Sequence, residues 1–537
     1  MSVMKKYLLR HIKKLVLATV IVIIYSFISI VPVKLTQQLI DAGFMKKDFK
    51  YIILCSLCIG VITITKSGLS YVSLKQFSNV GYSIVADLRN DIFDRVLHFP
   101  IDYFTGKDSG YLSSRLNEIS QISSLFSPNN VTFFAGIIEA FFALAILGTM
   151  NIQLLLLCCI PMVIYIKISA YATRNYQKII EDALETDAQY TGKLNETIKG
   201  QEEIRLNNGQ KQEREKFHQY SETLKFKAIK QALLLGGTTE LLTTITSLVS
   251  IFIYIACGFF VIKGQLTIGE LISFSQYAGK LYSPIISFSS VVLVVQPALS
   301  SIKRIKEAFY ENVPAVHNGN KTINMITELR VNNLCYNYPS GRRDLFKDIS
   351  FAIKRPSLCY IKGQNGSGKT TLSKILLKLI DGYSGEVVVN GIELEEISER
   401  SYREQCAAVS QKVFLFNDTI YNNIVYGMTN VTLEHYERAI RLSGLDVVLR
   451  LLPDGEKTIV GENGSILSGG EKQKVSIARA LLKNASVIVL DEPSNNLDKE
   501  SQFELKKVLK GISCEKIVIV IDHNDVFEDV ATSIITL

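Results

Sequence analysis

A glycine-rich loop carries the clearest chemistry in this sequence. A β-rich run ends at Gly363 and an apolar-periodic helix begins near Thr370, so the loop joins a strand to a helix. Small residues let the backbone N–H groups wrap around phosphate, and the helix N-terminus adds positive charge. The strand–loop–helix setting therefore favours a phosphate-binding loop over an ordinary glycine-rich turn. Lys369 can reach the outer phosphates of a nucleotide, and the Thr370 hydroxyl can ligate Mg²⁺. The residues expected to bind phosphate are Gly363, Gln364, Asn365, Gly366, Ser367, Gly368, Lys369, Thr370 and Thr371.

A second candidate group lies about 120 residues downstream, in VIVLDEPSNNLD. Four apolar β-formers end in Asp491, the position from which a carboxylate holds Mg²⁺ in enzymes with such a loop. Glu492 follows directly and could polarise a water molecule that faces the terminal phosphate. By themselves the two residues would suggest solvated carboxylates at a strand end, but the upstream phosphate loop favours a catalytic pair.

A third group opens a helix in LSGGEKQKVSIARALLK. Ser468 is a good N-cap, Gly469 and Gly470 leave the backbone uncovered, and Glu471 lies in the first turn. Two interpretations stay open from these residues alone: a well-capped helix, or a second anion-binding site built from Ser468 and the exposed N–H groups.

The elements that would position these residues divide the chain in two. Mean hydropathy is +0.20 although 20% of the residues are charged, so apolar residues must gather in blocks. From about residue 300 onwards strands and helices alternate, as in an α/β domain. Before that point, six stretches are long enough, or nearly so, to cross about 30 Å of hydrocarbon. They are Leu15–Val33, Tyr51–Val72, Val131–Met150, Leu154–Tyr171, Leu241–Ile262 and Leu271–Val295.

The connections between these stretches predict a topology. The third and fourth are joined by a tight hairpin at residues 151–153, and the fifth and sixth by a short loop. Residues 73–130 and 172–240 show helical periodicity and dense mixed charge, so we expect helices that extend out of the bilayer on one face. The uncleaved, basic KKYLLRHIKK at the N-terminus favours a cytoplasmic start, and six spans place both termini in the cytoplasm.

Five charged residues lie inside or near the predicted spans. Glu139 lies near the middle of the third span, where an unpaired carboxylate is costly, so we expect a watery cavity or a partner base and a candidate substrate contact. Four others lie nearer the predicted cytoplasmic ends or in extended helices, where solvent or snorkelling accounts for them. They are Lys66, Lys167, Glu240 and Lys280.

Composition excludes several classes of protein. The net charge is +8, from 59 basic and 51 acidic residues, with both signs interleaved, so no nucleic-acid partner is expected. Low Pro, Gly and Cys contents exclude disorder, collagen and a disulfide scaffold. Cys55 and Cys58 form a CxxC without a second pair or a nearby His, so they are interpreted as apolar filler rather than a zinc or redox site.

Taken together, the motifs resemble those of ATP-binding-cassette (ABC) proteins. LSGGE resembles their signature, and residues 328–537 resemble their nucleotide-binding domain. Tyr338 matches the aromatic residue that stacks on adenine in these proteins. Gln411 matches their glutamine that contacts Mg²⁺. Asp498, in SNNLD, matches the D-loop, whose commoner form is SALD. His523 matches the switch histidine near the γ-phosphate, although Asp522 precedes it where Thr or Ser is usual.

The resemblance covers nearly the whole chain and implies a half-size exporter. The implied fold is a six-helix membrane domain at 1–305, a linker at 306–327 and a cytoplasmic α/β P-loop NTPase domain at 328–537. The implied ligands are ATP and Mg²⁺, the latter held by Thr370, Gln411 and Asp491. Glu492 and His523 would be catalytic, and the partners would be membrane lipid, a transported substrate and a second copy of the chain in a homodimer.

The resemblance leaves the substrate and the direction of transport open. The combination of LSGGEKQ with DEPSNNLD resembles cassettes of bacterial peptide exporters and favours a peptide carried across the cytoplasmic membrane. A drug or lipid exporter, an importer on the exporter fold, and a non-transporting regulator are the alternatives. The presence of Ser468, Glu492 and His523 argues against a regulator that binds but does not hydrolyse ATP.

Overall fold

The computed structural model describes residues 2–104, 109–311, 318–337, 345–364, 366–495, 497–523 and 525–537. The chain separates into two compact units. The first comprises Met1–His98 and Asp108–Val313, and the second comprises Phe99–Lys107 and Pro314–Leu537. Each is described by itself.

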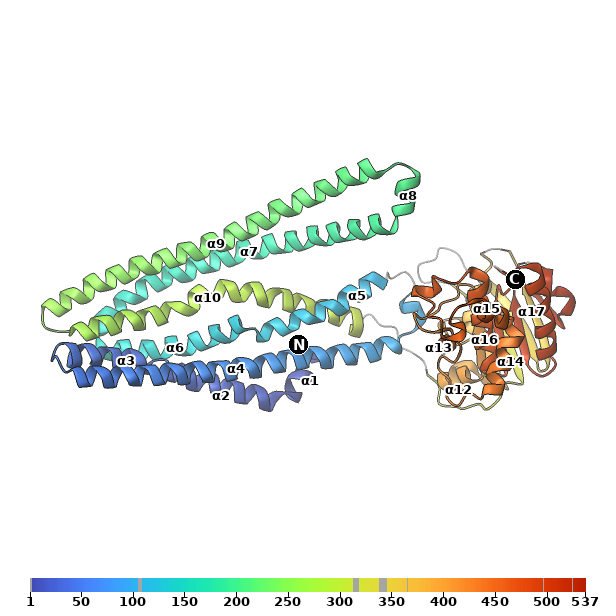
Figure 1. Cartoon of the computed structure of the whole chain (residues 1–537), viewed down its shortest axis with the longest axis horizontal. Helices are drawn as coiled ribbons and strands as arrows, with labels where there is room; N and C mark the ends of the chain where they lie inside the picture. The colour runs from blue at the N-terminus through green and yellow to red at the C-terminus, as the bar shows by residue number, and fades with distance from the viewer. Residues whose placement is uncertain are drawn as a thin grey trace. The chain divides into compact units, whose positions relative to one another are not determined.

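The first unit is helical throughout its described residues (Figure 1). Short helices begin the chain and cover its turns: α1 (Ser2–Arg10), α3 (Val31–Gln38), η1 (Leu39–Phe44), α5 (Ser109–Glu118), η3 (Ile119–Phe126), α8 (Gln201–Leu206) and η4 (Glu307–Glu311). The long elements are α2 (Ile12–Ile28), α4 (Phe49–Leu97), α6 (Pro128–Met150), α7 (Ile152–Lys199), α9 (Gln210–Ile262) and α10 (Ile268–Lys306).

Side-chain caps define one end of this helical unit, which we call the hairpin end. Asn151 is the single residue between α6 and α7, and its side chain accepts hydrogen bonds from the first N–H groups of α7. Thr267 and Glu270 form a capping box at the start of α10. Asp41 accepts bonds from the Thr267 hydroxyl at 2.7 Å and the Gly269 N–H at 2.9 Å, which ties the η1 turn to the α9–α10 turn.

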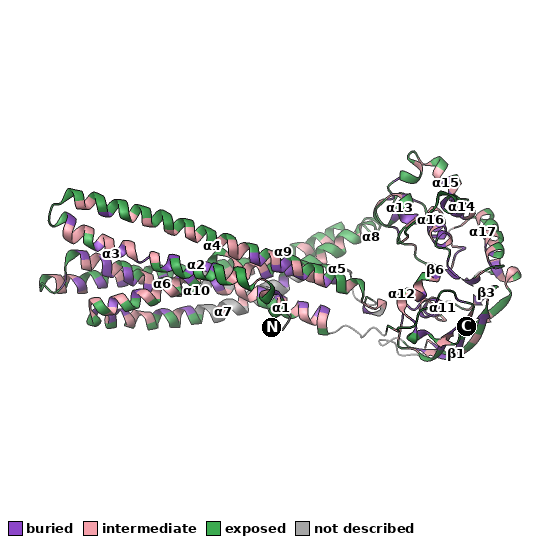
Figure 2. Ribbon diagram, turned by 90° about the horizontal axis from the view of Figure 1, so that it is seen from below, coloured by how far each residue is buried: buried purple, intermediate pink, exposed green. Residues whose placement is uncertain are grey.

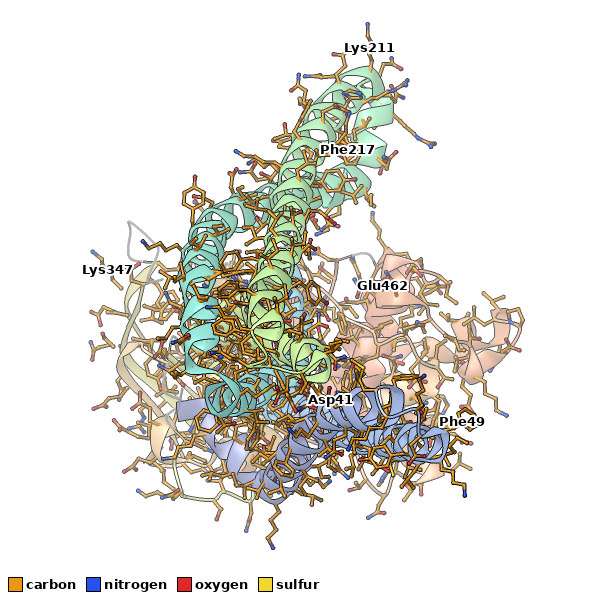
Figure 3. All side chains as sticks on the ribbon, turned by 90° about the vertical axis from the view of Figure 1, so that its left-hand side faces the viewer. Asp41, Phe49, Lys211, Phe217, Lys347 and Glu462 are labelled. Atoms are coloured by element: carbon orange, nitrogen blue, oxygen red, sulfur yellow. The ribbon has the colours of Figure 1, made fainter. Side chains whose placement is uncertain are left out.

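The long helices extend well beyond a bilayer. At 1.5 Å per residue, the 48 residues of α7 and the 53 of α9 span about 72 and 80 Å. Their far ends, joined through α8, are charged, and Figure 3 shows Lys211 pointing away from this extension. The helices predicted to leave the bilayer are therefore present.

Five helical segments are long and apolar enough to cross a membrane, and they contain the first five predicted spans. The sixth predicted span falls in α10, which the same criterion does not select among the described residues. Serines interrupt its apolar sequence, yet buried residues such as Phe274, Tyr277 and Tyr282 pack it into the core shared with α7 and α9. Figure 2 shows buried residues gathered between the helices, with exposed residues along the outer side of α4.

The second unit contains two β-sheets. A four-stranded antiparallel sheet has the order β2-β1-β4-β5, and a five-stranded parallel sheet has the order β6-β7-β8-β3-β9. The strands are β1 (Glu328–Tyr336), β2 (Phe346–Lys354), β3 (Ser357–Lys362), β4 (Ser384–Val389), β5 (Ile392–Glu393), β6 (Cys406–Val409), β7 (Val487–Asp491), β8 (Ile517–Ile521) and β9 (Ser533–Thr536).

Helices cover both faces of the parallel sheet, as its uniformly apolar strands require. Cys359, Val489 and Ile519 face the core that contains α11 (Lys369–Leu376) and β1. Tyr360 and Leu490 face the opposite core, with α16 (Gly469–Leu482) and α17 (Lys499–Ile512). Smaller helices complete the unit: η5 (Leu394–Glu396), α12 (Glu399–Glu404), α13 (Ile420–Ile424), α14 (Leu433–Ser443), α15 (Leu445–Leu451), η6 (Gly455–Lys457), η7 (Glu462–Gly464) and η8 (Asp525–Val530).

A short segment from the first half of the chain is grouped with this second unit. It contains η2 (Ile101–Tyr103), where Tyr103 is buried and stacks edge-on with Phe99 and Phe104.

Candidate active site

The sheet order brings the candidate residues together. Strands β6, β7, β8 and β3 are neighbours and run parallel, so their carboxyl ends share one edge of the sheet. Gln411 follows β6, Glu492 follows β7, His523 follows β8 and Gly363 follows β3. Loops at this edge are where open α/β sheets place their ligands.

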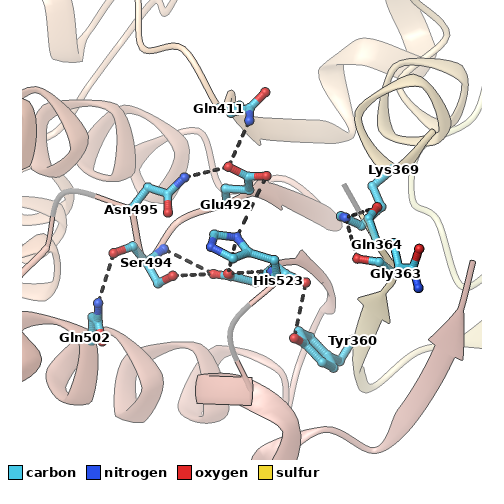
Figure 4. A network of polar contacts seen from close by, with 11 residues as sticks. Tyr360, Gly363, Gln364, Lys369, Gln411, Glu492, Ser494, Asn495, Gln502 and His523 are labelled. Carbon is cyan, nitrogen blue, oxygen red and sulfur yellow. Dashed lines mark hydrogen bonds and ion pairs between the residues drawn. The ribbon is translucent and has the colours of Figure 1, made fainter. Parts of the chain in front are cut away.

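The phosphate loop requires glycine at Gly368. Its φ is +93°, and a Cβ there would lie 2.7 Å from a ring carbon of Phe346 and 2.9 Å from Leu345. Lys369, the first residue of α11, is buried, and its Nζ donates to the carbonyl oxygens of Gly363 at 2.7 Å and Gln364 at 3.0 Å. The ammonium group therefore lies against the loop that is expected to surround phosphates (Figure 4).

Asp491 ends β7 as a buried carboxylate beside Thr370. Its Oδ1 has no hydrogen-bond partner among the described residues, which is unusual for a buried carboxylate oxygen. Burial raises the pKa of Asp491 above its usual range, and a hydrogen bond with Thr370 opposes that shift. An unpartnered carboxylate oxygen next to a hydroxyl is an oxygen donor set that suits Mg²⁺.

Glu492 adopts a left-handed backbone conformation, with φ of +51°, that is uncommon for a residue with a side chain. Its N–H donates to the Ile521 carbonyl at 2.7 Å, which holds this conformation. Two amide groups, from Gln411 at 2.8 Å and Asn495 at 2.5 Å, donate to Oε2, whereas Oε1 lies 4.0 Å from His523 Nδ1. Backbone strain at a fixed carboxylate is a common feature of active sites.

Asp522 connects the loops that follow β7 and β8. It is fully buried, and its Oδ2 accepts a hydrogen bond from the Ser494 hydroxyl at 2.6 Å. Its Oδ1 accepts from the His523 N–H at 2.7 Å and lies 3.5 Å from His523 Nδ1. Figure 4 shows Ser494, His523 and Glu492 close together, with Glu492 next to the imidazole.

These groups surround a cavity of about 410 Å³. Most of the predicted phosphate, metal and catalytic residues line it or lie at its edge. The lining residues are Leu345, Gly366, Gly368, Lys369, Thr370, Thr371, Gln411, Glu492 and His523. Tyr338 and Asn365, both predicted to bind ATP, lie outside the described residues.

The predicted residues of the signature and the D-loop do not line this cavity. Ser468, the N-cap of α16, forms a capping box with Glu471, and Gly469 and Gly470 begin the helix. Asp498 is the N-cap of α17, where hydrogen bonds from Ser501 lower its pKa.

The sequence patterns missed two positioning residues. In the sequence, Asn495 is only a departure from the commoner D-loop motif. Asp522 is only a replacement for the usual Thr or Ser. Both contact catalytic candidates, Glu492 and His523. The signal for both residues is their position in the loops that follow β7 and β8, because these loops lie at the edge of the sheet where the site is.

In the helical unit, Glu139 has partner bases. Lys280 Nζ lies 2.7 Å from Glu139 Oε2, and Lys66 Nζ lies 3.8 Å from Oε1. The expectation that solvent or snorkelling accounts for Lys280 is therefore wrong. For Lys66, whose side chain is 36% exposed, solvent still accounts for part of the charge. Sequence position alone could not show that α4, α6 and α10 bring these three side chains together.

The fold and the site define a membrane protein with a P-loop ATPase domain, and the comparisons name its family. Residues 15–285, just over half of the chain, match the model of the ABC transporter transmembrane region, and residues 346–495 match that of the ABC transporter ATPase. This chain belongs to the ABC transporter family.

Individual relatives span most of the chain. It is 31% identical to an ATP-dependent lipid A-core flippase of Pseudomonas putida, over 83% of this chain and 74% of the relative. It is 29% identical to a protein of the same name from Desulfotalea psychrophila, over 91% of this chain and 86% of the relative. A structure of a bacterial Atm1-family ABC exporter with ATP bound superposes with a TM-score of 0.85 at 20% identity, covering 98% of this chain and 93% of the other.

These findings confirm the predicted type of protein. It is a half-size ABC exporter in which an ATP-hydrolysing domain follows a multi-pass membrane domain, and it couples ATP hydrolysis to transport. The proposed peptide substrate is not confirmed, because the relatives reported above are named as lipid flippases.

Proposed function

We propose that two copies of this chain form a homodimer in the cytoplasmic membrane that exports an amphipathic substrate by alternating access. In this proposal the membrane domain is 1–305, the linker 306–327 and the ATPase domain 328–537, with the ATPase domain in the cytoplasm. The observation that carries the proposal is the ring of Lys369, Gln411, Glu492 and His523 around one cavity, because it gives this chain the groups that hydrolysis needs. The relatives' names support a lipid-like substrate, and the peptide stays an alternative.

The cavity residues suit Mg²⁺ together with ATP. We propose that Thr370, Asp491 and Gln411 hold the ion, because Asp491 Oδ1 is buried without a partner among the described residues. When bound, Mg²⁺ offsets the charge of the phosphate oxygens. The backbone N–H groups of residues 363–371 and the Lys369 ammonium surround the phosphates, and Tyr338 stacks on the adenine.

Glu492 and His523 have different roles in hydrolysis: Glu492 acts on the water molecule and His523 on the γ-phosphate. The amides of Gln411 and Asn495 fix Glu492 through Oε2, which leaves Oε1 to orient a water molecule and accept its proton. Asp522 orients His523 so that the imidazole donates to the γ-phosphate as negative charge develops there. Both groups are in place before the reaction, so little reorganisation is needed.

Transport by reconstituted protein tests the proposal. The purified chain in proteoliposomes, with ATPase domains outward, should accumulate a fluorescent amphiphile when Mg–ATP is added. Lys369→Ala, which removes the phosphate-binding ammonium, should abolish accumulation, whereas Lys374→Ala, a lysine of the same helix that does not line the cavity, should transport normally. Equal accumulation with and without ATP would contradict an exporter, and selective accumulation of a peptide would replace the lipid-like substrate.

A further inference from the structure

The ATPase domain has a second cavity besides the one described above. Its volume is about 560 Å³, which is typical of small-molecule sites. Its walls come from α14, the last turn of α16, the second half of α17, and the residues that lead into β7 and β8. The three helices pack on one another and lie side by side in Figures 1 and 2. We call this space, whose polar lining includes Arg438, Asn484, Lys507, Glu515 and Lys516, the strand-start cavity.

The strand-start cavity lies at the opposite edge of the parallel sheet from the ATP cavity. Asn484 precedes β7, and Lys516 precedes β8. Glu492 and His523 follow these same two strands. Each strand has five residues, so about 17 Å of strand separates the two edges. No described residue lines both cavities, so a ligand of the strand-start cavity would not occupy the ATP site.

Positive charge in the strand-start cavity exceeds negative charge. Three basic side chains line it, those of Arg438, Lys507 and Lys516, whereas Glu515 supplies one carboxylate. Lys507 already pairs with Glu504 at 2.9 Å. Arg438 and Lys516 form no ion pair with any residue that the structure describes. Two cationic groups in one cavity are therefore available to an anionic ligand.

Lys516 is held in place for such a ligand. Its side chain is partly buried, and its Nζ donates to Asn484 Oδ1 at 2.8 Å, which leaves two of its three N–H donors for other partners. Burial lowers the pKa of Lys516. Glu515 opposes this shift, whereas the positive charges of Arg355 and Arg438 add to it. An ammonium group that has lost water and faces like charges is stabilised when an anion binds beside it.

The apolar part of the lining indicates what carries the negative charge. Leu482 and Ile488 are buried, and Leu442, Val508 and Ile512 are partly buried. An inorganic ion would leave this apolar surface in contact with water, whereas an aromatic or aliphatic group would cover it. Two cationic groups and a side-chain amide suit a phosphate monoester, which carries about 1.5–2 negative charges at neutral pH.

We propose that the strand-start cavity is a binding site for a phosphate monoester with an apolar body. The phosphate oxygens accept charge-assisted hydrogen bonds from Arg438 and Lys516, and the amide NH₂ of Asn484 donates a further bond. The apolar body lies against Ile488 and Val508. This site is separate from ATP hydrolysis and does not depend on the proposed export function.

Titration calorimetry of the full-length chain in phosphatidylcholine nanodiscs tests the ligand class. The Lys369→Ala variant is titrated without nucleotide, so that the disabled phosphate loop does not compete for the probes. The probes are phenyl phosphate, inorganic phosphate without the ring, phenol without the charge, and phenyltrimethylammonium with the opposite charge. We expect phenyl phosphate to bind at least roughly tenfold more tightly than each of the other three. Equal binding of any of them would overturn the inference.

Substitutions added to Lys369→Ala locate the binding. Arg438→Gln and Lys516→Gln should each weaken phenyl phosphate binding roughly tenfold, because each removes one charge-assisted hydrogen bond. Lys510→Gln, which removes an exposed lysine of α17 outside the cavity, is the matched control and should have no effect. Arg438 is exposed, so its replacement should leave the unfolding midpoint unchanged, and weaker binding then does not reflect misfolding. Unchanged binding in Arg438→Gln and Lys516→Gln, or an equal loss in Lys510→Gln, would overturn the inference.

Discussion

Asp522 is the residue that most distinguishes this ATPase site. A buried carboxylate accepts hydrogen bonds from Ser494 and from the His523 backbone, so one side chain fixes two catalytic loops relative to each other. A Ser or Thr at this position, as in the family pattern, would be too short to make both contacts. The arrangement suggests that this chain positions its switch histidine through a charged group.

Replacing Asp522 should slow hydrolysis without preventing ATP binding. Asp522→Ser leaves the Ser494 hydroxyl without its acceptor and His523 without its support, so we expect the turnover number to fall by roughly tenfold with a similar KM for ATP. Asp525→Asn, which changes an exposed carboxylate paired with Lys362, is the control. Steady-state ATPase assays decide, and equal effects of the two changes would contradict a positioning role for Asp522.

Asp491 should oppose the folding of the nucleotide-free protein. Burial raises its folded-state pKa, so the protonated form is favoured in the fold. The contribution of this group to stability is therefore highest below its unfolded pKa of about 3.9, and part of it is lost as pH rises through the raised folded value. At pH 7, Asp491→Asn should raise the unfolding midpoint by about 2–4 °C, since the uncompensated charge is gone.

The same substitution should remove the stabilisation that Mg–ATP provides. A ligand that binds only the folded state raises the midpoint, and the amide is a poor substitute for a metal-binding carboxylate. Asp446→Asn, at a partly exposed ion pair with Arg450, should change neither midpoint measurably. Thermal unfolding followed with and without Mg–ATP checks both effects, and an Asp491→Asn protein that is still stabilised by Mg–ATP would contradict the metal assignment.

At the scale of elements, we expect α16 to have both a structural and a catalytic role. Ser468 and Glu471 cap its N-terminus reciprocally, which stabilises the helix, yet the described lining of this chain's own cavity does not include them. A helix N-terminus that presents bare N–H groups at Gly469 and Gly470 suits a phosphate supplied by a second chain. Stability and catalysis can therefore be separated by experiment.

Ser468→Ala should reduce ATPase activity strongly but thermal stability only as much as the loss of any N-cap. Removing an N-cap hydroxyl costs about 1 kcal/mol of folding free energy. Thr432→Ala removes the equivalent cap of α14, away from the cavity, so it is a matched control. We expect similar losses of thermal stability in both variants but a clear loss of ATPase activity only in Ser468→Ala. Equal ATPase activities would show that Ser468 is only a cap.

Sequence patterns predicted the elements whose residues are close in the chain. The strand–loop–helix around Lys369, the capped α16 and the hairpin at Asn151 follow from local rules of backbone freedom and capping. The contacts of Asn495 and Asp522 depend on the strand order β7-β8. The ion pairs of Glu139 with Lys66 and Lys280 depend on how α4, α6 and α10 pack. These arise from tertiary structure, which short-range periodicity does not encode.

At the scale of the whole molecule, the chain has one phosphate loop and one signature helix. Ser468 does not line the described cavity with Lys369, and in the family these two motifs lie on opposite sides of one ATP. In the proposed homodimer one cassette does not complete its own site, whereas two cassettes packed head-to-tail complete two. Because the phosphate loop, signature, Glu492 and His523 are all of the competent type, we expect both sites of a homodimer to hydrolyse ATP.

Glu492→Gln should trap this dimer. The amide keeps the shape and ATP affinity of the site but cannot accept a proton, so hydrolysis should slow by roughly 10²–10⁴-fold, as is usual for a lost general base. The closed state should then persist as a dimer of one kind of chain with two ATP molecules bound. Glu500→Gln, which changes a carboxylate in the first turn of α17, is the control and should turn over normally.

Mass measurement and single-turnover kinetics of the purified chain in Mg–ATP test this expectation. The dimer model requires turnover to rise cooperatively with ATP, because two nucleotides must be sandwiched before either site is complete. It also requires Ser468→Ala chains mixed with Lys369→Ala chains to recover part of the ATPase activity, since in such a mixed pair one of the two sites has both an intact phosphate loop and an intact signature. A monomer that hydrolyses ATP without cooperativity, or normal turnover by Glu492→Gln, would contradict the shared-site model.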